Sequence, residues 1–147
     1  MKKIVLVEDD VMLAEIYQTR LLLAGYDCFV ANDGALGVSA IQQHLPDLAL
    51  LDLMLPQLSG DEILKIMRDS VWGKDIPVII LTNISESEAP LSLKLLKFER
   101  YIVKVSLENN QLAEIVGETL GSLQNAKPWL LMWRISRRLY ICLKLQL

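Results

Sequence analysis

Short runs of apolar residues alternate along the chain with longer stretches whose apolar residues recur at helical spacing. A short, continuous apolar run is typical of a strand buried on both faces of a sheet, whereas the helical spacing is typical of a helix packed by one side. The runs predict five strands, at residues 3–7, 27–31, 47–52, 76–82 and 100–104. Helices are expected between and after them, at residues 11–25, 33–46, 59–70, 86–98 and 109–123.

This alternation of strand and helix predicts an α/β fold, a doubly wound parallel sheet of five strands with helices on both faces. In such sheets, binding sites form at the carboxyl ends of the strands. Polar side chains follow or end four of the five predicted strands, and they are Glu8, Asp9, Asp52, Thr82 and Lys104. We therefore expect these side chains to share one edge of the sheet.

Asp52 stands out because it lies within the apolar stretch LALLDLMLP, residues 48–56. Ionised carboxylates are rarely buried unless a cation or hydrogen bonds compensate them. A position at the end of a buried strand, where the chain reaches a polar site, explains this aspartate best.

The chemistry of these side chains indicates a site for phosphoryl transfer. Glu8, Asp9 and Asp52 would repel one another unless a cation or a proton intervened, and Mg²⁺ prefers such oxygen ligands. Lys104 adds a compact positive charge that could contact a phosphoryl group, and Thr82 adds a hydroxyl donor. A carboxylate nucleophile, a divalent cation, a lysine and a hydroxyl are the parts of an acyl-phosphate site.

Composition limits the classes of function. Residues 1–125 hold ten basic and eighteen acidic side chains, so we expect no direct binding of nucleic acid by this acidic body. The two cysteines, Cys28 and Cys142, form no spacing motif, and the acidic EDD after residue 7 interrupts the only candidate for a signal peptide. These features favour the cytoplasm.

In its motifs the sequence resembles the receiver domain of two-component response regulators, of the stand-alone, single-domain type. The resemblance spans nearly all of residues 2–123 and rests on VLVEDD, PDLALLDLMLP…SG, IPVIILT and YIVK, in that order. It implies a flavodoxin-like fold with strand order 2-1-3-4-5. It also implies a signalling phosphoacceptor rather than an enzyme, with at most slow self-catalysed phosphorylation and dephosphorylation. A histidine kinase or phosphotransfer protein would be the donor, and the changed surface would bind a downstream protein that the sequence does not identify.

The resemblance also assigns a role to each residue of the predicted site. Asp52 would accept the phosphoryl group, and Thr82 and Lys104 would contact its oxygens. Tyr101 would be the switch aromatic that moves inward as Thr82 closes on the phosphate. The Mg²⁺ ligands it implies are Asp9 and Asp52 directly, Glu8 through water, and the backbone carbonyl of Met54.

Three departures from the family pattern keep an alternative open. Val105 follows the lysine where the family usually has proline, Asn83 follows the threonine where a small residue is usual, and KFER replaces a Gly-Ala pair before the fifth strand. We expect a trans bond before Val105, because a cis bond there would cost about 3–4 kcal/mol. The alternative is an interaction module of the same fold that phosphorylation does not regulate. An aspartyl-phosphate hydrolase and a flavin-binding electron carrier fit less well, because their first loops need different residues.

The last segment differs in composition from the rest of the chain. We expect a receiver domain at residues 1–124 and a basic, apolar extension of uncertain order at residues 125–147. Residues 126–147 hold five basic side chains and no acidic one. This extension could mediate a homodimer or partner contact, lie on a membrane surface, pack as an arm of the fold or be a non-native extension.

Overall fold

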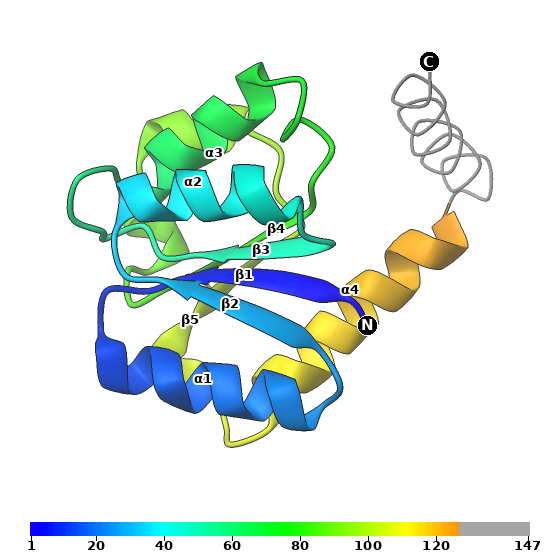
Figure 1. The fold of residues 1–147 in the computed structure, drawn as a ribbon. Coiled ribbons are helices and arrows are strands. Elements are labelled where there is room, and N and C mark those ends of the chain that lie inside the picture. The colour runs from blue at the N-terminus through cyan, green and yellow to red at the C-terminus, as the bar shows by residue number, and fades with distance from the viewer. Residues whose placement is uncertain (127–147) are drawn as a thin grey trace, which may run out of the picture. The chain divides into compact units, whose positions relative to one another are not determined.

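The computed structural model describes residues 1–126 as a parallel sheet flanked by helices (Figure 1). The strands are β1 (Lys3–Val7), β2 (Asp27–Ala31), β3 (Leu48–Leu51), β4 (Val78–Thr82) and β5 (Arg100–Val103). The α-helices are α1 (Val11–Leu23), α2 (Gly34–His44), α3 (Gly60–Asp69) and α4 (Gln111–Ala126). Three short 3₁₀ helices are η1 (Glu86–Glu88), η2 (Leu91–Leu95) and η3 (Lys104–Ser106). The predicted extension at 125–147 lies almost wholly outside the described residues.

The sheet has the expected order, β2-β1-β3-β4-β5, and every neighbouring pair is parallel. This confirms the predicted fold class. The register places Val7 of β1 beside Leu51 of β3, so the chain leaves both strands at the same level. Thr82, the last residue of β4, lies beside Val103 of β5 in the same way.

Residues Met1–Glu114 form one compact unit whose core lies on both faces of the sheet. Helices α2 and α3 cover one face, and α1 covers part of the other (Figure 1). Alternate residues of each strand point to opposite faces, which is why the strands read as continuous apolar runs. The side chains packed under α2 and α3 include Val5, Val7, Ala49, Leu51, Val78 and Ile80. Within residues 1–126, no helix is long and apolar enough to cross a lipid bilayer.

The helix expected at residues 86–98 is absent, and that prediction is wrong. Two 3₁₀ helices, η1 and η2, occupy the segment, and Pro90 lies between them. A residue before proline avoids the α conformation, and Ala89 is accordingly extended, with φ −62° and ψ 149°. Leu93 is buried in the core, and Leu96 and Phe98 pack partly against it. Core packing therefore fixes this segment in short turns rather than in one continuous helix.

Cys28 of β2 is buried, and burial raises the pKa of its thiol to about 12. The unfolded chain loses this proton near pH 8.5–9, so above that pH the folded state binds more protons than the unfolded state. The contribution of this raised pKa to the free energy of unfolding is therefore complete below about pH 8.5 and is lost as pH rises toward 12. In a Cys142→Ser background, we expect the advantage of Cys28 over Cys28→Ala in the free energy of unfolding to shrink by about 1–2 kcal/mol between pH 8 and pH 10. Urea unfolding at both pH values measures it, and an unchanged difference would contradict the prediction.

Candidate functional site

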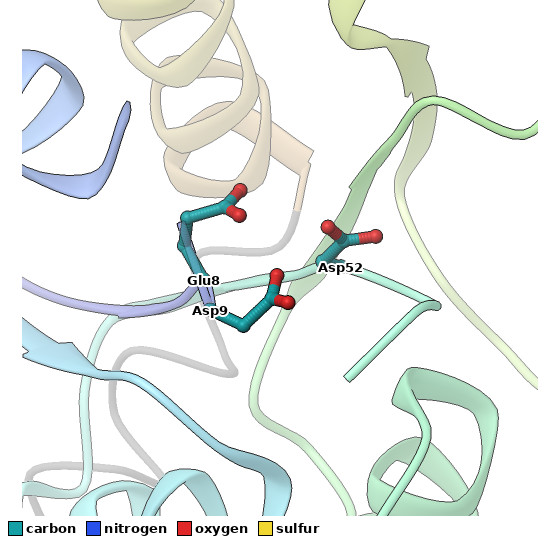
Figure 2. A group of neighbouring side chains, drawn as sticks. All are labelled: Glu8, Asp9 and Asp52. Carbon is teal, nitrogen blue, oxygen red and sulfur yellow. The ribbon is translucent and has the colours of Figure 1, made fainter. Parts of the chain in front are cut away.

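Four of the predicted side chains, Glu8, Asp9, Asp52 and Lys104, meet at one edge of the sheet. Glu8 and Asp9 follow β1, and Asp52 follows the neighbouring strand β3 (Figure 2). One carboxylate oxygen from each of the three lies within 4.8 Å of the others. Glu8 and Asp52 are buried, whereas Asp9 is exposed to solvent.

Lys104 contacts this cluster from the end of β5. It is the first residue after β5, and its ammonium Nζ lies 2.5 Å from Oδ2 of Asp52 and forms a second ion pair with Oε2 of Glu8. The lysine is itself buried, with 9% of its surface exposed. A buried ammonium in contact with two buried carboxylates compensates their charges where water cannot.

These contacts set the protonation of the buried groups. Burial raises the pKa of Glu8 above its ordinary value, and the hydrogen bond and charge of Lys104 oppose this only in part. Burial alone would lower the pKa of Lys104, but its contacts with Asp52 and Glu8 outweigh that effect and raise it. Lys104 therefore stays positively charged at neutral pH.

The backbone around Asp52 fixes the direction of its carboxylate. The Asp52 N–H donates to the Val7 carbonyl at 3.2 Å, which continues the pairing of β3 with β1 by one residue. The N–H of Met54 donates to Oδ1 of Asp52 at 3.1 Å, while Lys104 contacts Oδ2. Each carboxylate oxygen thus has its own partner, and the side chain is held in one orientation.

Thr82 is the last residue of β4, and Tyr101 lies in the adjacent strand β5. Thr82 is fully buried, and its hydroxyl oxygen accepts a long hydrogen bond of 3.5 Å from the Ile84 N–H. The hydroxyl of Tyr101 donates to the Ile84 carbonyl at 2.8 Å, so this half-buried ring is tied to the loop that follows Thr82. Burial also raises the pKa of Tyr101.

Two of the three departures from the family pattern, Val105 and Asn83, directly follow residues of the predicted site. Val105 is 84% exposed in η3, and the described residues contain no cis peptide bond, so the expected trans bond before Val105 is confirmed. Asn83 is exposed directly after Thr82. Met54, whose carbonyl was predicted as a metal ligand, has a side chain that is 65% exposed.

The donor set fits a small divalent cation. Three carboxylates converge against one ammonium, so the site keeps an excess of negative charge when all four groups are ionised. Hard oxygen donors with an exposed member suit Mg²⁺, which retains several waters and takes few protein carboxylates. Glu8 and Asp52 already share Lys104, so the exposed Asp9 is the carboxylate most available to a cation.

Gly60, the first residue of α3, supports the site through a close backbone contact. A Cβ on Gly60 would lie 2.1 Å from the Asp52 carbonyl oxygen, because the start of α3 packs directly on the backbone of Asp52. The Gly60 N–H also donates to the Leu53 carbonyl at 3.1 Å. Its φ is not positive, so only this close approach requires glycine, and no local sequence signal reveals it.

We expect Gly60→Ala to lower the free energy of unfolding by about 3 kcal/mol, because the neighbour that must move is backbone. Urea unfolding measures this. Gly121→Ala in α4 is the control, since among the described residues nothing lies within 4 Å of a Cβ there, and it should not destabilise the protein. Equal effects of the two substitutions would contradict the role of this contact.

Comparison with known proteins agrees with this geometry. The sequence profile of the response regulator receiver domain matches residues 4–116. The chain belongs to the response regulator receiver domain family. The receiver domain protein (CheY-like) of Methanospirillum hungatei JF-1 has the same fold, with a TM-score of 0.78, 24% identity and coverage of 86% of this chain and 99% of that chain.

Two further similar proteins are a transcriptional regulator and the receiver domain of a sensor histidine kinase. The "Probable transcriptional regulator ycf27" of Porphyridium aerugineum is 34% identical over 103 residues, which are 70% of this chain and 42% of that protein. The chain thus spans less than half the length of this relative. The receiver domain of the sensor histidine kinase PA1611 from Pseudomonas aeruginosa PAO1, solved with a magnesium ion in its active site cleft, has a TM-score of 0.74 and 25% identity over 82% of this chain and 98% of that one.

Proposed function

We propose that this receiver domain accepts a phosphoryl group on Asp52 from a phosphohistidine of a histidine kinase or phosphotransfer protein. The observation that carries the proposal is the buried Lys104 ammonium in contact with both Asp52 and Glu8, beside the exposed Asp9. A buried acid with a positive partner at the end of a strand is the arrangement that an acyl phosphate needs.

The chain's own residues would divide the work. A carboxylate oxygen of Asp52 attacks the phosphorus while the bond from phosphorus to the donor nitrogen breaks, and the imidazole keeps that electron pair. Lys104 and the Thr82 hydroxyl would contact the phosphoryl oxygens. Asp9, Asp52 and the Met54 carbonyl, with Glu8 through water, would hold Mg²⁺. Bound Mg²⁺ would offset the negative charge of the phosphoryl group.

The output would follow from the same contacts. Engagement of Thr82 by the phosphoryl group would move the loop that includes Ile84, and the Tyr101 hydroxyl bonds to that residue. A local charge event would thereby bias a two-state surface and change its affinity for a downstream protein. We place this exchange in the cytoplasm, without direct contact between the acidic body and nucleic acid.

A second candidate is a receiver-fold interaction module that phosphate does not regulate. The absence of a continuous helix at residues 86–98 favours it, as do Asn83 and Val105 beside the site. Incubation with acetyl phosphate, with and without Mg²⁺, separates the two. Intact mass and peptide mapping should show one Mg²⁺-dependent phosphoryl group on Asp52. A protein that stays unmodified would support the unregulated module.

A further inference from the structure

The peptide bond between Glu8 and Asp9 is held from the neighbouring strand β2. The Glu8 N–H donates to the Ala31 carbonyl at 3.0 Å. The side-chain amide Nδ2 of Asn32 donates to the Glu8 carbonyl, also at 3.0 Å. Both polar groups of the Glu8 backbone are therefore bonded to the end of β2, although strand β1 ends at Val7.

Hydrogen bonds fix the backbone on both sides of Asp9, at Glu8 and at Asp10. Before it lies the Glu8 carbonyl, which Asn32 holds. After it lies Asp10, whose N–H donates to Oε1 of Glu8 at 3.1 Å and whose side chain caps α1 by accepting from the Leu13 N–H at 3.0 Å. The orientation of the Glu8–Asp9 peptide therefore sets where the Asp9 side chain starts. That side chain is exposed, so core packing does not otherwise fix it.

We propose that Asn32 is a positioning residue for divalent cation binding, because its amide fixes the Glu8–Asp9 peptide and keeps the Asp9 carboxylate beside Asp52 (Figure 2). The inference rests on the proposed function, since it concerns the cation of the same site. Asn32 acts through the backbone of Glu8 and need not touch the ion. Contacts of this outer kind orient metal ligands, and their loss commonly costs 10–100-fold in affinity.

The test is Mg²⁺ titration of the unphosphorylated protein, followed by backbone amide NMR shifts of Asp9 and Asp52. We expect Asn32→Ala to weaken Mg²⁺ binding about 10-fold. The matched control is Asp33→Ala, which removes the cap of α2 at the next residue, where the aspartate accepts from the Leu36 N–H at 2.7 Å. This control lowers stability and removes one exposed charge but leaves the Asn32–Glu8 bond in place, so its Mg²⁺ affinity should stay within about twofold of the parent's.

A loss of less than about threefold in Asn32→Ala, or an equal loss in Asp33→Ala, overturns the positioning role. Asp9→Asn, titrated in parallel, separates this failure from failure of the proposed function. If Asp9→Asn weakens binding and Asn32→Ala does not, only the role of Asn32 is wrong. If Asp9→Asn binds Mg²⁺ as the parent does, the metal site itself is wrong.

Discussion

Asp52→Asn is expected to abolish Mg²⁺-dependent phosphorylation by acetyl phosphate, reducing incorporation by at least about 100-fold. The amide keeps the size of the side chain but has no anionic oxygen to attack phosphorus. Asp52 is buried beside Lys104, and a hydrogen bond from the Met54 N–H fixes the orientation of its carboxylate. Intact mass spectrometry of the parent and the variant measures the effect.

The substitution should leave the fold intact, because Lys104 retains its ion pair with Glu8. The control is Asp69→Asn, which removes an exposed carboxylate at the end of α3 that pairs with Lys65. That variant should be phosphorylated as fully as the parent. Incorporation that persists undiminished in Asp52→Asn would place the acceptor on another residue.

The strands and the site edge could be predicted from the sequence because both depend on simple patterns. Strands β1 and β2 have the predicted bounds, since polar residues directly follow both runs, Glu8 and Asp9 after β1 and Asn32 and Asp33 after β2. Asp52 and Lys104 each fall one residue after their strands, and parallel pairing then brings them to one edge. The local apolar pattern was enough to predict the site, because parallel pairing of the strands brings their carboxyl ends together.

The parts that the sequence did not reveal depend on contacts between distant segments. The turns at residues 86–98 follow from core packing of Leu93 around Pro90, which competes with helical spacing. The double ion pair of Lys104 with Glu8 and Asp52 was also unforeseen, because the lysine was assigned only to a phosphoryl group. Gly60 packs on the backbone of Asp52, and Asn32 donates to the Glu8 carbonyl after β1. Neither contact follows from the local sequence pattern.

Asp9→Asn is expected to weaken Mg²⁺ binding to the unphosphorylated domain by about 10–100-fold. Glu8 and Asp52 share the Lys104 ammonium, whereas Asp9 is exposed and adds a further negative charge where a hydrated cation can approach. Asparagine keeps an oxygen in the same place but loses that charge. Isothermal titration at fixed ionic strength measures the dissociation constant.

The matched control is Asp10→Asn, which makes the same change in net charge one residue away. Asp10 caps α1, and asparagine is an equally good cap, so stability should be kept. Because Asp10 is not one of the three converging carboxylates, this variant should bind Mg²⁺ within about twofold of the parent. If the two variants lost affinity equally, the general negative potential of the edge would account for the binding. Distinct losses, large for Asp9→Asn and small for Asp10→Asn, require direct ligation, since two exposed charges one residue apart contribute similarly to a diffuse field.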